Sequence, residues 1–217
     1  MSVNVNSFKV YCDFIANKVQ AGGTTTTVQR NELSHQAQMS CFEKDRLVFI
    51  KTGELSDFLK CFLRSTVINP NVLTGFHSYP ADFQHTAGVR SYYNKKERPV
   101  ELVENKAWGE VQVSLLAPPT KQFPKYTEFA NEYRFLPRDI GIVMLDYLKE
   151  PVKPIWAYTI SSNVQVYDPT ASVDFEWDAF SLNRVAAEYL SYIGINIQSV
   201  QLAQYSQQFK EETKSIV

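Results

Sequence analysis

Three carboxylates at alternate positions are the first candidate for chemistry in the sequence: Asp174, Glu176 and Asp178. Alternate side chains of an extended strand project from one face, so the three could hold a divalent cation, or Asp174 and Glu176 could be the carboxylate pair of a hydrolase. The same acids directly precede a helix pattern, where the helix dipole favours negative charge and Asp178 can cap the first turn. No glycine-anchored calcium loop accompanies them. We therefore expect them to begin a helix, and we predict no catalytic residue, cofactor or metal site.

Histidines and cysteines are the second candidate, namely His35, His77, His85, Cys12, Cys41 and Cys61. Zinc sites need closely spaced ligands, as in Cys-x-x-Cys or His-Glu-x-x-His, and the sequence contains neither pattern. A nucleophilic Cys–His pair stays open as an alternative, although His35 and Cys41 do not share a helix face. We expect Cys12 and Cys41 to be buried on the apolar faces of helices, as reduced thiols.

Phosphate and nucleic-acid binding find little support in the sequence. The pair Gly22-Gly23 is followed by threonines and lacks the lysine of a phosphate-binding loop. Residues 91–99, SYYNKKERP, combine tyrosines with cations as single-strand binding surfaces do, but Glu97 lies among the cations, and a solvated turn or a protein contact explains them equally well. The formal net charge of −1 gives no basic footprint for tight binding to nucleic acid.

Composition is typical of a single globular domain. The chain has 217 residues, of which 44% are hydrophobic and 21% charged, enough to build its own core. The first ten residues lack the basic and apolar regions of a signal peptide, and the longest apolar runs, such as residues 140–145, are far shorter than the roughly 20 residues of a spanning helix. We expect a protein without membrane contact, from a reducing compartment.

Hydrophobic periodicity divides this domain into four segments. They are N-terminal helices over residues 1–68, an irregular insertion over 69–125, a small β-sheet over 126–168 and C-terminal helices over 178–217. We therefore expect an α+β fold in which the N- and C-terminal helices form a bundle and a small antiparallel β-sheet lies at the centre.

Several local signals sharpen this expectation. Ser7 can cap the first helix, and Thr26 with Gln29 resembles the capping box of the second. We expect a third helix over residues 56–64, a short helix around 108–115, and a hairpin of strands 129–135 and 143–147. Two more short strands, 156–160 and 164–167, follow. An apolar stripe predicts a helix ended by Gly194, and we expect a final helix from residue 200 to about 211. The stripe comprises Leu182, Val185, Ala186, Tyr189, Leu190 and Ile193.

Aromatic residues concentrate in the last third of the chain. We expect five of them to wedge the sheet against the last helices and to contribute to an interface: Trp156, Tyr158, Tyr167, Phe175 and Trp177. The glutamine-rich tail that follows is better suited to docking than to a core, and we assign Gln204, Gln207 and Phe209 to the same interface.

The order of several motifs resembles virion proteins of crAss-like and related Bacteroidetes-infecting tailed phages. NSFKVYCDFIANKVQAGG and NELSHQAQMSCFEKDR resemble their opening, and LDYLKEPVKPIWAYT, NVQVYDPTASVDFEW and YIGINI resemble their end. LLAPPTK and the turn Leu136-Pro137-Arg138-Asp139 lie where that family places a Pro-Thr segment and a strand-joining turn. The resemblance covers most of the chain except about residues 69–90.

This resemblance implies a head-to-tail connector, one copy of a neck ring stacked beneath the portal. It also implies an adaptor-like fold, since the adaptor proteins of short-tailed phages combine a helical bundle with a small β domain. The implied partners are copies of the same chain, the portal protein, other neck or tail proteins and, transiently and without sequence specificity, duplex DNA. It implies no catalytic residues, and it implies location in the virion after assembly in the host cytoplasm. A tail or capsid accessory protein, or a small hydrolase that uses Asp174 and Glu176, are the alternatives.

Overall fold

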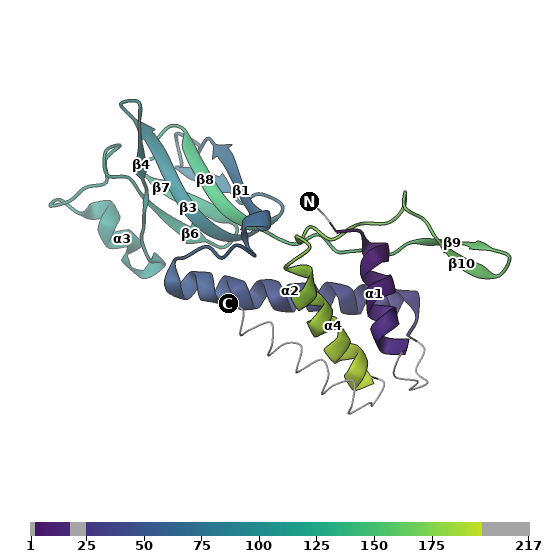
Figure 1. Ribbon diagram of the computed structural model, residues 1–217. Coiled ribbons are helices and arrows are strands. Elements are labelled where there is room, and N and C mark those ends of the chain that lie inside the picture. Colours follow the sequence, from purple (N-terminus) through teal and green to yellow (C-terminus); the bar gives the residue numbers. More distant parts are fainter. Residues whose placement is uncertain (1–2, 18–24, 197–217) are drawn as a thin grey trace. The chain divides into compact units, whose positions relative to one another are not determined.

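The computed structural model describes residues 3–17 and 25–196, which form two compact units (Figure 1). The first unit joins residues of the range 1–61 with residues from Pro151 onward, and the second spans Phe62–Glu150. The second unit is therefore inserted, in sequence, between the two halves of the first. The expectation of a single domain stays a prediction, and the residues group into these two compact units.

Three helices build the first unit: α1 (Val5–Asn17), α2 (Thr27–Thr52) and α4 (Leu182–Asn196). The expected capping box begins α2, because Thr26 Oγ1 accepts a hydrogen bond from Gln29 N at 3.3 Å and Gln29 Oε1 accepts one from Thr26 N at 2.9 Å. At the other end of α2, Gly53 adopts the left-handed conformation that closes a helix and donates its N–H to Phe49 O.

The other two helices differ slightly from expectation. Asn4, not Ser7, caps α1, since Asn4 Oδ1 accepts hydrogen bonds from Asn6 N at 2.9 Å and Ser7 N at 3.2 Å. The whole expected stripe of α4 is buried, but the helix continues to Asn196, beyond the expected end at Gly194.

Aromatic rings fill the core of the first unit. The Phe8 ring of α1 lies 4.6 Å from Phe175 and 5.5 Å from Tyr189 of α4, measured between ring centroids. Two isolated β-bridges, Val3 with Phe175 and Ile155 with Val173, hold the extended segments beside these helices. The aromatic segment before α4 therefore belongs to the core of this unit.

The second unit contains two four-stranded sheets and the helix α3 (Asn105–Val113). The first sheet has the order β1 (Leu63–Ile68), β8 (Val143–Lys149), β3 (Phe83–Tyr93), β4 (Lys96–Pro99). The second has the order β2 (Phe76–Ser78), β7 (Glu132–Leu136), β6 (Lys125–Phe129), β5 (Glu101–Leu102). Neighbouring strands are antiparallel except β5 and β6. A short 3-10 helix, Lys60–Phe62, precedes β1.

One apolar cluster joins both sheets of this unit. Tyr133 and Phe135 of β7 contribute to it together with Val143 and Leu145 of β8, and all four are buried. The alternation that predicts β7 and β8 is thus confirmed, because alternate residues of each strand face this core.

The expected fold class is wrong. In place of a helical bundle with one small central sheet, the described residues contain four α-helices and ten strands in three sheets. The expectation for residues 69–125 is responsible for most of the difference, since this range holds β2 to β5 and α3. The sequence does not predict β3, because it is an inner strand whose side chains are mostly half-buried. Its residues FQHTAGVRSYY therefore show no clean alternation of polar and apolar side chains.

Two further predictions, a hairpin and a helix, are wrong for local reasons. The expected hairpin of strands 129–135 and 143–147 does not form, because β7 and β8 lie in different sheets, and the run 129–135 itself contains a turn at Ala130, with φ of 50°. The expected helix over 56–64 is replaced by the 3-10 helix and the start of β1. The helix around 108–115 corresponds to α3, and the final helix from residue 200 lies outside the described residues.

Candidate interaction surfaces

A separate two-stranded hairpin extends from the first unit, built from β9 (Tyr158–Ser161) and β10 (Val164–Tyr167) (Figure 1). Its register pairs Tyr158 with Tyr167 and Ser161 with Val164. The two turn residues, Ser162 and Asn163, both have positive φ, as in the tight turns that match the twist of a hairpin. The expected strands and turn are thus confirmed, and we call residues 158–167 the arm.

Trp156 anchors the base of the arm. Its ring stacks on Tyr158 and Tyr167 at centroid distances of 5.6 and 6.0 Å, and its Nε1 donates to Asn6 Oδ1 at 2.9 Å. Asn31 of α2 holds the same residue twice, because Asn31 Oδ1 accepts from Trp156 N at 3.1 Å and Asn31 Nδ2 donates to Trp156 O at 3.3 Å. The base of the arm is thereby fixed to α1 and α2.

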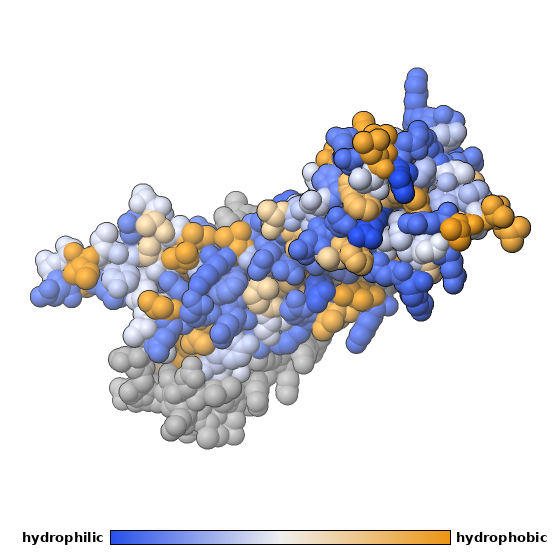
Figure 2. All heavy atoms as spheres, turned by 180° about the vertical axis from the view of Figure 1, so that it is seen from behind, coloured by the Kyte–Doolittle hydropathy of each residue, from blue (hydrophilic) through white to orange (hydrophobic). Residues whose placement is uncertain are grey.

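Beyond its base, the arm exposes apolar side chains on both faces. The register places Ile160 on the face of Tyr158 and Tyr167, and Val164 and Val166 on the opposite face. Ile160 is 72% exposed and Val164 61%. No residue between 154 and 167 is charged, and hydrophobic side chains are visible on the arm at the left of Figure 2. Such an uncharged ribbon is typical of a protein contact.

The second unit carries its own exposed apolar segment, which follows α3. Leu115 is 96% and Leu116 101% exposed, and Val113 is exposed beside them. Hydrophobic side chains of this loop form the protrusion at the right edge of Figure 2. Residues 111–120, VQVSLLAPPT, include no charge. We call residues 113–119 the leucine loop.

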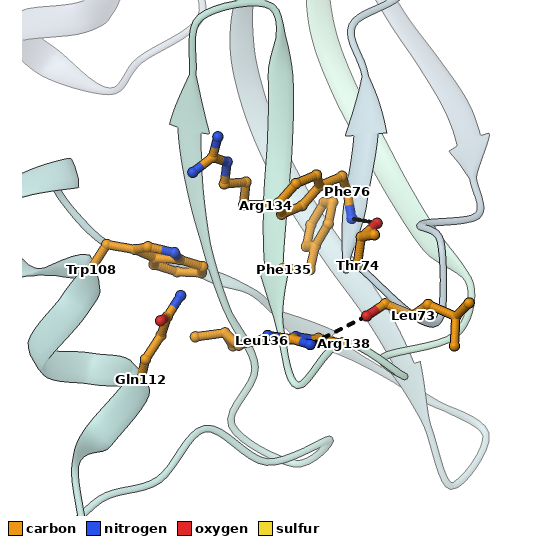
Figure 3. Close-up of a pocket in the computed structure, with 9 residues that line it drawn as sticks. All are labelled: Leu73, Thr74, Phe76, Trp108, Gln112, Arg134, Phe135, Leu136 and Arg138. Carbon is orange, nitrogen blue, oxygen red and sulfur yellow. Dashed lines mark hydrogen bonds between the residues drawn. The ribbon is translucent and has the colours of Figure 1, made fainter.

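A cavity of about 200 Å³ opens in the second unit between α3, β2, β7 and the turns beside them (Figure 3). We call it the aromatic pocket, and it is lined by Leu73, Thr74, Phe76, Trp108, Gln112, Arg134, Phe135, Leu136 and Arg138. Glu132 Oε1 accepts a 3.0 Å hydrogen bond from Arg134 Nε, and the guanidinium of Arg134 lies 4.8 Å from the centroid of Phe76. Arg138 Nη1 donates to Leu73 O at 3.3 Å.

The predicted carboxylates all accept hydrogen bonds from backbone N–H groups. Asp174 Oδ1 accepts from Val5 N at 2.8 Å, and Glu176 Oε2 accepts from Val152 N at 3.1 Å. Asp178 Oδ1 accepts from Ser181 N at 2.6 Å, directly before α4, so its expected role at the helix start is confirmed. Asp174 and Glu176 do not begin α4 as expected, because they bond the backbone at the start of α1 and at Val152 instead. Within residues 3–17 and 25–196, no group of three or more His, Cys, Asp or Glu residues could hold a metal ion.

Burial disfavours the thiolate form of two cysteines. Cys12 and Cys41 are both buried, as expected from their helical positions. Burial raises the pKa of Cys41 to about 11 and raises that of Cys12 further, with a contribution from Asp13 to Cys12. Near neutral pH both are protonated thiols, which are poor nucleophiles. His35 Nδ1 lies 3.2 Å from Gln38 Nε2, so its described contact is with an amide.

Glu97, the acid among the cations of residues 91–99, pairs with a cation outside that range. Arg90 donates to Glu97 and to Asp146, each at 2.7 Å, and Tyr92 Oη donates to Glu97 Oε1 at 2.8 Å. The hydrogen bonds from Tyr92 and then Arg90 lower the pKa of Glu97. Arg90 of β3 therefore compensates the charge of Glu97.

The structure places the predicted interface residues in different environments. Phe175 and Trp177 are in the core, Trp156 is buried at the base of the arm, and Tyr158 and Tyr167 belong to the arm itself. Gln204, Gln207 and Phe209 lie outside the described residues. An interface role for these eight residues stays a prediction. The sequence reasoning missed Ile160, Val164 and the leucine loop, although uncharged apolar stretches beside turns mark both segments.

Comparison with known proteins assigns the chain to no family. No protein-family model matches the chain, and a search of curated proteins gives no significant match. Among the helices of the described residues, none combines the length and the hydrophobicity required to cross a membrane.

Proposed function

We propose that this chain is a non-enzymatic structural protein of a tailed-phage virion. In this proposal it is a ring-forming connector that joins the portal to the tail and lines the passage of the DNA. The arm supports the proposal most directly, since Ile160 and Val164 expose apolar surface on opposite faces of a hairpin that pairs with no other strand of the described residues. The order of the sequence motifs resembles that of phage neck proteins, and this resemblance is the reason for proposing a neck assembly.

The physical argument begins with the stability of the arm. A two-stranded hairpin alone is marginally stable in water, and both of its edges present unpaired backbone groups. A neighbouring subunit that covers Ile160 and Val164 would contribute roughly 1.5–3 kcal/mol for each side chain that it buries fully. Strand addition at an edge of the arm would add backbone hydrogen bonds. The arm is therefore most stable inside an assembly.

A ring needs two different surfaces on each subunit, because a head-to-tail contact closes by rotation. The chain offers different apolar segments on its two units, the arm on the first and the leucine loop on the second. The net charge of −1 is compatible with a passage along which duplex DNA slides without being held. The proposed partners are copies of this chain, the portal protein and other neck or tail proteins, in the virion.

The experiment compares the purified chain with an arm variant, Ile160→Asp with Val164→Asp. Sedimentation velocity and negative-stain microscopy, with and without the portal protein, report ring formation and portal binding. We expect rings from the unchanged chain and their loss in the variant, because two carboxylates cannot be buried without partners. The matched control is Val48→Lys, which removes an exposed apolar side chain near the C-terminal end of α2, where a cation is favourable.

The outcomes separate the possible roles. Rings that join the portal and depend on the arm support the connector. Binding to a tail or capsid protein without any contact to the portal would instead indicate an accessory protein of the virion. A chain that stays monomeric at every concentration and joins no virion component would refute the proposal.

A further inference from the structure

The aromatic pocket has the size and the walls to receive one apolar side chain. A cavity of about 150 Å³ already holds a benzene molecule, and the pocket measures about 200 Å³. Trp108 and Phe135 form buried walls, and Phe76, which is 39% exposed and lies beside the guanidinium of Arg134, closes one side (Figure 3). A leucine side chain with part of its backbone would therefore fill it.

The leucine loop has the complementary shape and polarity. Leu115 and Leu116 are almost fully exposed, so neither side chain occupies the pocket of its own subunit. Pro118 and Pro119 lack N–H groups, and Ala117 N already donates to Ser114 Oγ at 3.2 Å, so the loop presents mainly carbonyl acceptors. Prolines also restrict the free loop and lower the entropy lost on docking.

The rim of the pocket supplies the matching donors. The bond from Arg138 to Leu73 O uses one of the five N–H groups of that guanidinium, and the Gln112 amide projects toward the pocket from α3 (Figure 3). The loop itself brings no charge into the contact, because residues 111–120 are uncharged. An uncharged, acceptor-rich apolar loop thus suits an aromatic pocket with a donor-rich rim.

We propose that the leucine loop of one copy docks in the aromatic pocket of a second copy. Loop and pocket are different surfaces of the same unit, so the contact is heterologous and repeats from copy to copy. The proposal rests on the proposed ring function, in which it provides a subunit contact apart from the arm.

The first test uses a fluorescent peptide of residues 111–121 and measures its binding to the full chain by anisotropy. Trp108 is the only tryptophan of the second unit, so a change in its emission, absent from Trp108→Phe, locates the peptide at the pocket. We expect saturable binding that weakens about tenfold or more when the peptide carries Leu115→Ala and Leu116→Ala. We expect a similar loss for the Gln112→Phe protein, in which a ring at an exposed position of the rim fills the mouth.

The second test uses complementation between full-length chains that also carry the arm substitutions Ile160→Asp and Val164→Asp. One chain has the loop substitutions Leu115→Ala and Leu116→Ala, and the other has Gln112→Phe. Each alone lacks one half of the contact, whereas their mixture restores a single loop–pocket pair. We expect sedimentation to show monomers for each chain and one-to-one dimers for the mixture.

The results distinguish this contact from the ring itself. Absence of peptide binding, or a mixture that sediments as its separate components do, overturns the loop–pocket contact. If rings of the unchanged chain form nonetheless, the proposed function stands without this contact. Peptide binding and complementation together with an unchanged chain that forms no rings would support the contact and refute the connector.

Discussion

Arg184 of α4 and Asp45 of α2 are joined by two parallel hydrogen bonds, Nη1 to Oδ2 and Nη2 to Oδ1, each 2.9 Å long. The guanidinium of Arg184 also lies 4.3 Å from the ring centroid of Phe58, which stacks on Phe180 at 6.0 Å. A single cation therefore connects α2, the loop after it and the turn before α4. Because the planar guanidinium matches the carboxylate at two points, the pair fixes the orientation of α4 against α2 as well as its distance.

Removal of this carboxylate should destabilise the first unit. In Asp45→Ala the guanidinium of Arg184 stays largely buried without its partner, and we expect the free energy of unfolding to fall by about 2 kcal/mol. Glu43→Ala is the matched control on the same helix, since its pair with Arg46 is more exposed and should contribute less than about 1 kcal/mol. Urea unfolding followed by the emission of Trp156 and Trp177 measures both losses, and equal losses would contradict the prediction.

Among the glycines of the second unit, Gly75 leaves the least room for a side chain. Its φ is 76°, and an added Cβ would lie 2.6 Å from Phe135 O, beside the aromatic pocket. We expect Gly75→Ala to cost about 2–4 kcal/mol, from backbone strain and from displacement of β7. Gly53→Ala measures the backbone strain alone, because Gly53 has φ of 73° but an added Cβ there would have no atom within 4 Å. We expect this variant to cost about 1 kcal/mol. Thermal unfolding compares the two, and a larger loss for Gly53→Ala would refute this assignment.

Glu97 should make the stability of the second unit depend on acid pH. Its pKa is lowered in the folded chain by the hydrogen bonds from Tyr92 and Arg90. Its contribution is therefore complete above the ordinary glutamate pKa of about 4.3 and is lost as the pH falls through the lowered folded value. We expect the chain to melt at a higher temperature than Glu97→Gln near neutral pH, with the difference disappearing in strong acid. A difference in melting temperature that does not change with pH would contradict this linkage.

Local signals predicted local structure well in this chain, and pairing between distant strands could not be predicted in the same way. The Thr26–Gln29 capping box and the arm depend on residues a few positions apart, and both are present. By contrast, β8 pairs with β1 and β3, about 80 and 60 residues earlier in the chain, and no turn residue encodes such partners. The prediction of a continuous strand over 129–135 failed because a turn at Ala130 interrupts it, and no glycine or proline marks that turn in the sequence.

The candidate surfaces were harder to predict than the elements that carry them. Apolar alternation in Ile160, Val164 and Val166 resembles that of a half-buried strand, and only the absence of a covering layer shows that these residues are exposed. Aromatic residues such as Phe175 and Trp177 are equally typical of cores and interfaces, and the structure places them in the core. The aromatic pocket combines residues from β2, α3 and β7, which are brought together only by the fold.

Asn31 should control the order of the arm, because it holds Trp156 by two hydrogen bonds. In Asn31→Ala both bonds are lost and the backbone N–H of a buried residue is left without this acceptor, so we expect the base of the arm to loosen by about 1–3 kcal/mol. Limited digestion with chymotrypsin reports this directly, since Tyr158 and Tyr167 are the first and last residues of the arm and cleavage needs an opened backbone. We expect about tenfold faster cleavage there, together with weaker ring formation.

The matched control is Asn183→Ala, which removes an exposed amide from α4 and leaves the arm untouched. Its digestion should follow that of the unchanged chain. If Asn31→Ala digests no faster at the arm but still assembles poorly, α2 itself would be the contact surface, and the arm would not be the segment that a neighbouring subunit covers. If both variants digest and assemble as the unchanged chain does, Trp156 is held by its stacking on Tyr158 and Tyr167 and by Asn6, and the hydrogen bonds from Asn31 are dispensable.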